Sequence, residues 1–334
     1  MQCLKPRTVG FHSDGKTLCW SHKKYSKEYP TFKLPCGKCL TCRLNQARET
    51  AIRCLHEAQM YQNNSFITLT YNDENLKSDR LQYIDFQLFQ KRLRDKIYRD
   101  FIKSFGLENW KLLDKEEKKL HYKKIAISIL VTGEYGDKEK RPHWHALIFN
   151  WRPSDEIYSH SNHRGDRIYK SKELDELWGK GFTELGQITL ESAGYVARYA
   201  TKKLYHGKDG THNYEPISKR SSKNAIGKTW LESFYHDAFD NGCIVLPDGS
   251  TAAIPRYYEK WLKKHHPKEW ERYVTTTKHK RIKEAEQRYE KTSQEERKAN
   301  LKRSGLKGLQ RKRSEAQEII LNQKMKNNQK HLKL

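Results

Sequence analysis

The sequence has no long apolar run, no secretory leader pattern and no internal repeat. Its longest apolar stretch, IAISILV at 125–131, is far too short to cross a membrane. The first residues, MQCLKPRTVGFH, contain no apolar segment of the kind that precedes a signal cleavage site. We therefore expect a soluble intracellular protein with no membrane partner. A length of 334 residues fits one to three domains with a substantial core.

Acidic residues are scarce relative to basic ones. The chain has 66 Lys and Arg but only 41 Asp and Glu, so its formal net charge is +25. Such an excess indicates a partner with a negative surface, either a nucleic-acid backbone or another anionic surface. The Lys/Arg-rich segment after about 270 has few apolar positions, which predicts an exposed helix or a partly disordered tail that contacts DNA phosphates.

The seven cysteines are an odd number, which argues against a disulfide framework. Three of them share one short motif, CGKCLTCR, and in a reducing compartment this spacing favours metal binding. Cys36, Cys39 and Cys42 are thus predicted zinc ligands, with Cys3 or Cys19 as the fourth. The alternative is a group of free thiols at the start of a helix. Cys54 lies near an apolar helix stripe and is expected in the core.

Periodicity predicts an α+β fold with a central antiparallel sheet flanked by helices. In this sheet 124–134 and HWHALIF form a hairpin, and the sequence does not determine which of their residues pair. We expect Asp85 to cap the second helix and Thr189 the helix with the tyrosines. The expected helices are 38–61, one after Asp85, 171–178 and 191–204; the expected strands are 65–71, 124–134, 143–149 and 181–189; 152–169 is predicted as a polar loop, and the chain after 206 as loop-rich up to 254.

The stretch RPHWHALIF places two histidines on one face of a strand, because side chains alternate. His143 and His145 are either a structural pair or two ligands of a metal ion. A third ligand is needed, and Glu134 at the end of the preceding strand supplies it if the register places it opposite His143, with Asp137 in reserve. Two imidazoles and a carboxylate suit Mn²⁺, tolerate Mg²⁺ and as a facial triad also suit Fe²⁺.

The segment ESAGYVARYATKK carries a second group of functional candidates. At 100° per residue, Tyr195, Tyr199 and Lys202 share one helix face, while Ala193 and Val196 belong to a separate apolar stripe. The bland interpretation is a pair of surface tyrosines. The functional one is nucleophilic catalysis, in which a cation and a polarised target compensate for a phenol pKa of about 10.

Three motifs in order, FITLTY, GEYG…RPHWHALIF and YVARYATKK, resemble the HUH endonucleases that start rolling-circle replication. The specific resemblance is to the replication initiators of gokushovirus-type microviruses, which also share PCGKCLTCR, GEYGDK, SAGYVARY and IPRYY, and it covers about 1–262. It implies a ferredoxin-like or RRM-like sheet. The roles it implies are metal binding by Glu134, His143 and His145, nucleophilic attack by Tyr195 and Tyr199, and assistance by Lys202.

By this resemblance the chain nicks single-stranded phage origin DNA, forms a 5′-phosphotyrosine and later rejoins the strand into a circle. Host helicase and polymerase would be its partners, in the host bacterial cytoplasm. Two alternatives remain: a non-catalytic basic protein that binds or packages single-stranded DNA, and an HUH transposase or relaxase-like enzyme. A metal-dependent covalent adduct separates the first alternative from catalysis.

The expected organisation has four parts, and none of them carries a nucleotide-binding loop. Gly227-Lys228-Thr229 resembles the end of a phosphate-binding loop, but Ser222 occupies the position where that motif requires its first glycine. We therefore expect unwinding to depend on a host helicase. The four parts are 1–62 with the cysteine cluster and a helix, 63–205 as the endonuclease core, 206–270 as a C-terminal extension and 271–334 as a basic tail.

Overall fold

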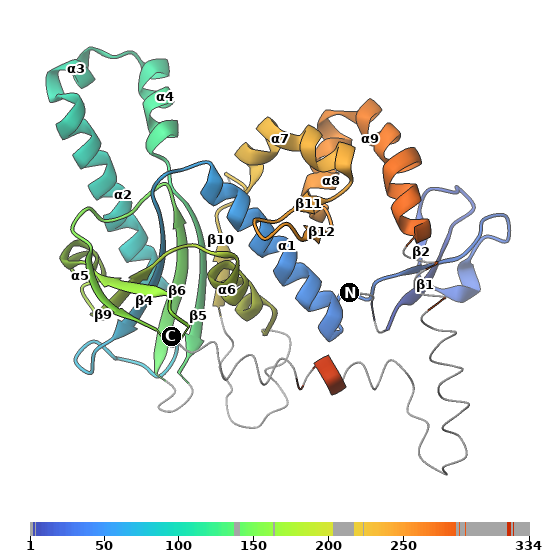
Figure 1. Cartoon of the computed structure of the whole chain (residues 1–334), viewed down its shortest axis with the longest axis horizontal. Helices are drawn as coiled ribbons and strands as arrows, with labels where there is room; N and C mark the ends of the chain where they lie inside the picture. Colours follow the sequence, from blue (N-terminus) through green and yellow to red (C-terminus); the bar gives the residue numbers. More distant parts are fainter. Residues whose placement is uncertain are drawn as a thin grey trace, which may run out of the picture. The chain divides into compact units, whose positions relative to one another are not determined.

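The computed structural model contains one large antiparallel sheet and several helices, which confirms the α+β prediction (Figure 1). The seven strands follow the order β10-β5-β6-β4-β9-β8-β7. The structure describes residues 3, 5–136, 141–162, 164–202, 217–222, 224–284, 287, 291, 319–321 and 323, with the backbone alone for 199–202.

The helices are α1 (Leu40–Gln59), α2 (Tyr83–Phe105), α3 (Leu107–Leu112), α4 (Lys115–Ile125), α5 (Lys172–Trp178), α6 (Leu190–Lys202), α7 (Lys228–Asn241), α8 (Arg256–His265) and α9 (Pro267–Tyr273), with short turns at His22–Lys24 and Val274–Lys278. The strands are β1 (Arg7–Phe11), β2 (Leu18–Cys19), β3 (Phe32–Leu34), β4 (Asn64–Tyr71), β5 (Ser128–Tyr135), β6 (Pro142–Phe149), β7 (Ile157–Ser161), β8 (Arg167–Lys170), β9 (Gly181–Gly186), β10 (Ile217–Arg220), β11 (Ile244–Val245) and β12 (Thr251–Ala252).

Both faces of the large sheet are covered, so its central strands are buried on both sides. On one face α2 and α5 pack on alternate strand residues such as Ile129, Val131 and Trp144. On the other face, side chains of α1 and α6 pack against Leu130 and Leu147. This two-layer burial explains why β5 and β6 read as nearly continuous apolar runs in the sequence.

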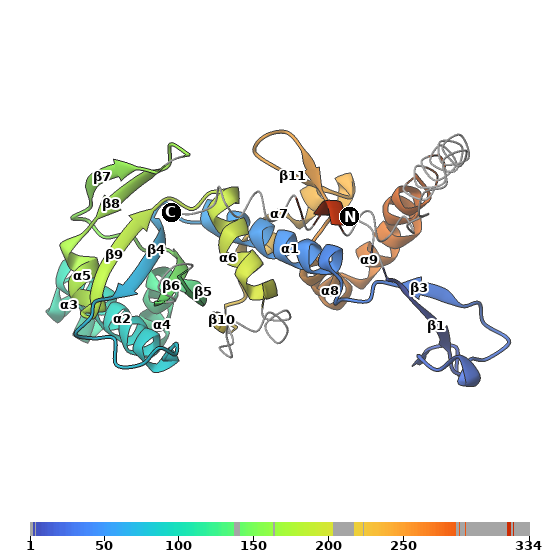
Figure 2. The ribbon, with the colours of Figure 1, turned by 90° about the horizontal axis from the view of Figure 1, so that it is seen from below.

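Contacts divide the chain into two compact units. One is residues 47–235, with the large sheet. The other joins 1–46 to 236–333 and contains the small sheet β2-β1-β3, the β11–β12 pair and the helices α8 and α9. The boundaries fall inside α1 and α7, the helices labelled in Figure 2, so neither coincides with a linker. No helix among the described residues is long and apolar enough to cross a membrane.

Several element predictions are confirmed, and others are wrong. Thr189 caps α6 as expected, since its Oγ1 accepts from the Ser192 amide at 3.2 Å. Asp85 is not an N-cap: α2 begins at Tyr83, and Asp85 instead accepts a hydrogen bond from the Tyr71 hydroxyl at 3.0 Å. The predicted loop 152–169 contains β7 and all but the last residue of β8, and α7 lies in the segment predicted as loop-rich.

Candidate functional site

The β5–β6 pairing places three predicted ligands at one end of the large sheet. Glu134 lies directly opposite His143 in the register, which resolves the question that the sequence left open. His145 follows two residues later, on the same face as His143. Between the histidines, Trp144 points to the other face, where it is fully buried and donates from Nε1 to the Tyr71 hydroxyl at 3.1 Å. Position 133 lies opposite Trp144 in the register. A glycine fits there, because a Cβ would come within 2.7 Å of the indole ring.

The three side chains converge on a single oxygen atom. Oε1 of Glu134 lies 3.1 Å from Nε2 of His143 and 2.7 Å from Nε2 of His145. Their ligand atoms all lie within 4.8 Å of one another. Glu134 and His145 are buried, whereas His143 is partly exposed at the mouth of the site. The arrangement is therefore a cluster of three possible ligands, of which His143 is the one that solvent reaches.

Outer contacts turn both imidazoles so that Nε2 faces the carboxylate. Nδ1 of His143 donates to the Arg141 carbonyl at 3.2 Å, since a carbonyl can only accept. Nε2 of a neutral His143 is then a bare lone pair facing a carboxylate oxygen, and a cation between the two would satisfy both. Nδ1 of His145 lies 3.0 Å from the Thr68 hydroxyl on β4, the kind of contact that fixes a metal-binding imidazole.

The protonation states also fit a metal ion. Burial favours the neutral carboxyl, but the charges and hydrogen bonds of the two histidines outweigh it and lower the pKa of Glu134 to about 2. Burial lowers the pKa of His145, against the opposing pull of Glu134. The charges that lower the pKa of Glu134 belong to protonated imidazoles, and a divalent cation, which binds an ionised carboxylate and neutral imidazoles, would take the place of those protons.

Tyr195 brings its phenol directly to this cluster. Its hydroxyl donates to Oε1 of Glu134 at 2.8 Å and lies 3.4 Å from Nε2 of His145. Its ring packs at 86° against the His145 imidazole, with centroids 5.1 Å apart. The buried stripe of α6, Ala193, Val196 and Ala197, holds the helix on the sheet so that Tyr195 projects toward the ligands.

The remaining predicted residues of this site fall outside what the structure describes. The backbone of α6 includes Tyr199 and Lys202, but the side chains of both lie outside the described residues. Asp137, the reserve ligand, lies outside them as well.

Sequence reasoning missed two threonines at the site. Thr68 contacts His145, and Thr132, the cross-strand neighbour of His145, is buried with no hydrogen-bond partner for its hydroxyl among the described residues. A buried polar atom without a partner next to a ligand set suits a site that takes a polar occupant. The alternation in FITLTY was a signal for Thr68, but the pairing of β4 with β6 is not readable from it.

Of the two cysteines considered as a fourth member, Cys3 lies with Cys36, Cys39 and Cys42. The Sγ atoms of Cys3, Cys36, Cys39 and Cys42 lie within 4.8 Å of one another. Three of the separations are 3.5, 3.7 and 4.0 Å, close to the roughly 3.8 Å between thiolates around tetrahedral zinc. Cys19 is not in this group, since its Sγ donates to the Ser21 carbonyl. Cys54 is buried in the core, as predicted.

The rejection of a phosphate-binding loop at Gly227 is also supported. The Gly227 amide, at the start of α7, donates to Oε2 of Glu57 at 2.7 Å, so an internal carboxylate already occupies the donor that a phosphate would use.

Comparisons with known proteins agree on one family. A family profile for replication-associated proteins of the ORF2 type matches residues 64–204. The chain is 45% identical over the full length of both proteins to the replication-associated protein VP4 of Bdellovibrio phage phiMH2K. It is 32% identical to the replication-associated protein ORF4 of Chlamydia phage 1, over 70% of this chain and 54% of that one. Identity to the replication-associated protein ORF2 of Spiroplasma virus 4 is 30%, over 85% and 87%. No solved structure matches.

Proposed function

The chain belongs to the family of replication-associated proteins, and we propose that it initiates rolling-circle replication by nicking single-stranded origin DNA. The proposal includes an HUH-type endonuclease fold for 63–205, acting in the infected bacterial cell. It fits the net charge of +25, because a protein that handles DNA needs basic residues to bind phosphates.

One observation carries the proposal: the Tyr195 hydroxyl lies 2.8 Å from Glu134 and 3.4 Å from His145, inside the three-ligand cluster. A tyrosine held only for packing has no need of two predicted metal ligands around its oxygen. A non-catalytic DNA-binding protein has no use for this convergence of a phenol, a carboxylate and two imidazoles.

Glu134, His143 and His145 would hold Mn²⁺ or Mg²⁺, which supplies Lewis-acid polarisation of the scissile phosphate when bound. The residues around them complete the site. Thr68 and the Arg141 carbonyl fix the two imidazoles, and Tyr195 supplies the attacking oxygen.

In the proposed step the phenolic oxygen of Tyr195 forms a bond to phosphorus while the bond to the 3′ oxygen breaks. The products are a 5′-phosphotyrosine and a free 3′-hydroxyl. The phenolic proton passes to solvent, and Glu134 orients the hydroxyl by accepting its hydrogen bond. Water returns a proton to the leaving 3′ oxygen. The number of phosphodiester bonds is conserved, so rejoining needs no nucleotide triphosphate.

We assign Tyr199, one turn further along α6, to the second cleavage that releases a circle, and Lys202 to assisting the active phenol. Two nucleophiles on one helix face let the protein cut the regenerated origin while the first strand remains attached. A host polymerase would extend the 3′-hydroxyl and a host helicase would unwind the duplex.

We assign the four-cysteine group to a structural zinc ion. Four sulfur ligands at tetrahedral spacing favour Zn²⁺ over the hard cations that suit Glu134 and the histidines. Burial raises the pKa of Cys42 to about 12, so without a metal this thiol stays protonated at neutral pH. The proposed zinc would join the N-terminal segment to the first turn of α1.

The test is a single-stranded origin oligonucleotide labelled on the 3′ side, incubated with the full chain and Mn²⁺ and run on a denaturing gel. We expect the label to migrate with the protein, and to be lost on chelation and in Tyr195→Phe. Tyr199→Phe is the matched variant, since it removes a hydroxyl from the same helix.

Loss of the adduct in Tyr199→Phe alone would reassign the first nucleophile. An adduct that survives both single substitutions and their combination would refute tyrosine attack. With the correct origin, absence of an adduct under every divalent metal would leave the chain a DNA-binding protein.

A further inference from the structure

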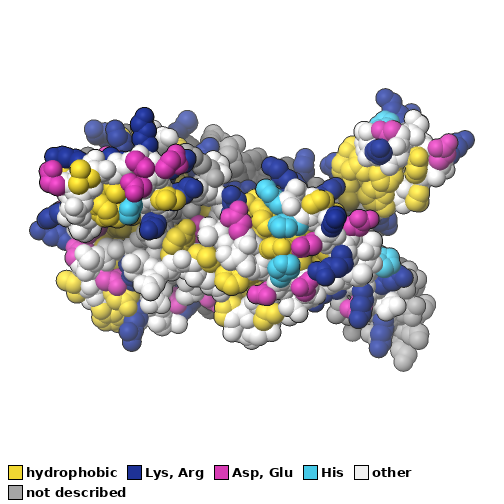
Figure 3. All heavy atoms as spheres, turned by 90° about the horizontal axis from the view of Figure 1, so that it is seen from above, with side chains coloured by type: hydrophobic (Ala, Val, Ile, Leu, Met, Phe, Trp, Pro, Cys, Tyr) yellow, Lys and Arg dark blue, Asp and Glu magenta, His cyan; other side chains and the backbone are white. Residues whose placement is uncertain are grey.

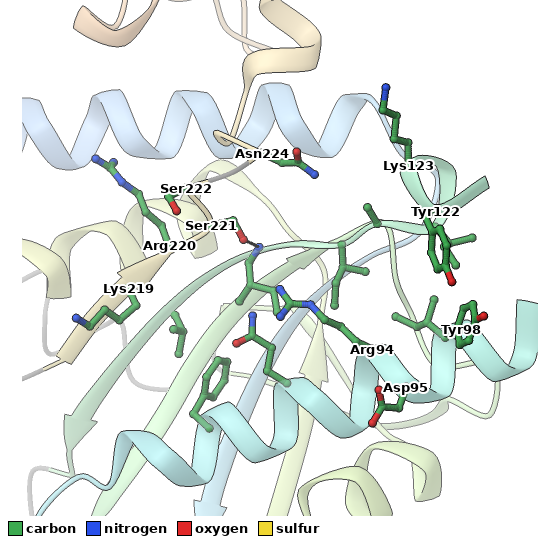
Figure 4. Close-up of a pocket in the computed structure, with 18 of the residues that line it drawn as sticks. Arg94, Asp95, Tyr98, Tyr122, Lys123, Lys219, Arg220, Ser221, Ser222 and Asn224 are labelled. Atoms are coloured by element: carbon green, nitrogen blue, oxygen red, sulfur yellow. Dashed lines mark hydrogen bonds between the residues drawn. The ribbon is translucent and has the colours of Figure 1, made fainter. Parts of the chain in front are cut away.

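A second cleft lies on the sheet face opposite the Glu134 cluster. Its volume is about 830 Å³, and its walls come from α2, α4, β5 and the edge strand β10 (Figure 4). Ile129 and Val131 of β5 line it, whereas Glu134 lies on the alternate face of the same strand. The cleft is therefore separate from the site proposed for strand cleavage.

The cleft concentrates positive charge. Five of its lining residues are basic and one, Asp95, is acidic. Arg94 extends from α2 into the opening (Figure 4). Nζ of Lys219 lies 5.8 Å from the centroid of the Tyr83 ring. Neither Arg94 nor Lys219 forms an ion pair with any described residue. On the face drawn in Figure 3, Lys and Arg side chains lie among acidic and apolar ones.

Aromatic rings and polar groups accompany the charge. Tyr98 and Tyr122 stack on each other at 18° with centroids 5.3 Å apart, and Tyr122 is 46% exposed. Ser222 and Asn224, on the opposite wall, have no hydrogen-bond partner among the described residues. The cleft thus offers an exposed ring for stacking, cations for phosphate, and donors and acceptors for base edges.

These features discriminate between ligands. The five basic side chains would repel a metal ion, and a purely apolar ligand would leave their charges without a partner. A volume of 830 Å³ is within the usual range of roughly 300–1,000 Å³ for binding pockets. A nucleotide fits these features, because its base can stack on a tyrosine ring and its phosphate can bind the basic side chains.

We infer that this cleft binds a short segment of single-stranded DNA away from the scissile phosphate. The inference rests on the proposed function only in taking DNA as the ligand. The edge strand β10 pairs with β5, Ile217 facing Gly133 and Lys219 facing Val131, next to Glu134. A strand that passes around this edge would lie in the cleft on one side of the sheet while the other side carries the cleavage site.

The experiment measures equilibrium binding of a labelled single-stranded oligonucleotide to the full chain in the presence of chelator, so that no cleavage contributes. The test variant is Arg94→Gln/Lys219→Gln. The matched control is Lys91→Gln/Lys103→Gln, which removes two charges from exposed positions of α2 outside the cleft.

Two phosphate contacts account for a change of about 1.4 in the slope of log affinity against log salt. We expect the test variant to lose that amount of slope and about tenfold in affinity, and the control to lose neither. Equal losses in both variants would show diffuse charge binding and overturn the inference, as would no loss in the test variant.

The stacking partner is tested separately. Tyr122→Leu should weaken binding about tenfold, and Tyr122→Phe should restore it, because a ring and not a hydroxyl is needed. Thermal melting checks that these variants are folded. Unchanged affinity in Tyr122→Leu would overturn the stacking role.

A free nucleotide has the same chemistry as a strand, so dATP is titrated alone in a calorimeter. Binding of dATP that the test variant loses while it keeps full oligonucleotide affinity would overturn the strand assignment. A wild-type chain that forms no covalent adduct would refute the proposed function but would leave these binding results intact.

Discussion

The chain contains two groups of residues that could each hold a metal ion, and they are built in contrasting ways. Glu134, His143 and His145 lie on adjacent strands of the large sheet, and the register of one hairpin aligns them. The four cysteines come from the N-terminal segment and the first turn of α1, in the other unit. In the first group His143 is partly exposed, and the Tyr195 phenol donates to the carboxylate. The second consists of four sulfur atoms, three pairs of which are 3.5 to 4.0 Å apart.

The difference teaches how ligand type and setting separate chemistry from stability. Oxygen and nitrogen ligands on a rigid sheet, with an open position, suit a hard cation that must meet a substrate. Four sulfur ligands on irregular chain suit a closed zinc site that replaces a hydrophobic core.

The largest expected effect is loss of the proposed zinc. Cys39→Ser should release one equivalent of zinc and destabilise the unit formed by 1–46 and 236–333 by up to about 10 kcal/mol. Cys19→Ser is the control, because Cys19 is buried yet outside the ligand group. Zinc content by mass spectrometry and thermal melting provide the measurements. Full zinc content in Cys39→Ser would contradict the four-cysteine assignment.

The next effect concerns the other group. Glu134→Gln keeps the size of the side chain and removes its charge, so nicking should fall about 10³-fold, equivalent to about 4 kcal/mol. Glu191→Gln on the exposed first turn of α6 serves as the matched change. Single-turnover rates at fixed Mn²⁺ decide the point. A rate within tenfold of wild type would remove Glu134 from the metal site.

A third prediction concerns the loss of folding stability at low pH, which we expect to come from a residue outside both groups. His56 on α1 is buried and stacks on Trp230 with centroids 3.5 Å apart, and burial lowers its pKa to about 4. Between pH 6.5 and 4 the unfolded chain binds more protons at this residue, so about 3 kcal/mol of stability is lost as pH falls. His56→Phe should flatten this part of the pH profile in denaturant titrations. An unchanged profile would assign the acid sensitivity elsewhere.

The smallest effect tests an indirect contact. Thr68→Val removes the hydroxyl that holds Nδ1 of His145, which should weaken metal affinity about 10- to 100-fold. The Mn²⁺ concentration for half-maximal nicking should rise, and saturating Mn²⁺ should restore the rate. Thr70→Val, on the same face of β4, is the control. A lower rate at saturating metal would show that Thr68 does more than orient the imidazole.

The β5–β6 hairpin was predictable because the evidence for it lies within its own sequence. β-branched runs and the alternation around Trp144 predict two buried strands, and the turn between them makes the strands neighbours. The boundary of the first strand was missed. Residues 124 and 125 end α4, whose Asp114–Glu117 capping box was a signal in the sequence.

Other parts were not predictable because they depend on distant contacts. Every residue of β7 is exposed, so no alternation of apolar and polar residues distinguishes this edge strand from a loop. Thr68 and Cys3 reach their partners only after β4 and the N-terminal segment are in place. The spacing in CGKCLTCR predicts three ligands, and the fold alone selects the fourth.

The register of β5 and β6 also has a consequence for the order of events during folding. Glu134 and His143 are 9 residues apart, whereas 36 separate Cys3 from Cys39 and 61 separate Glu134 from Tyr195. A hairpin closes in about 1–10 μs, and longer loops close later because their entropy cost is larger. The carboxylate and both imidazoles are thus expected to meet in a nascent chain before Tyr195 reaches them. A divalent ion present at that moment would bind the hairpin first, and the tyrosine would join a site already assembled.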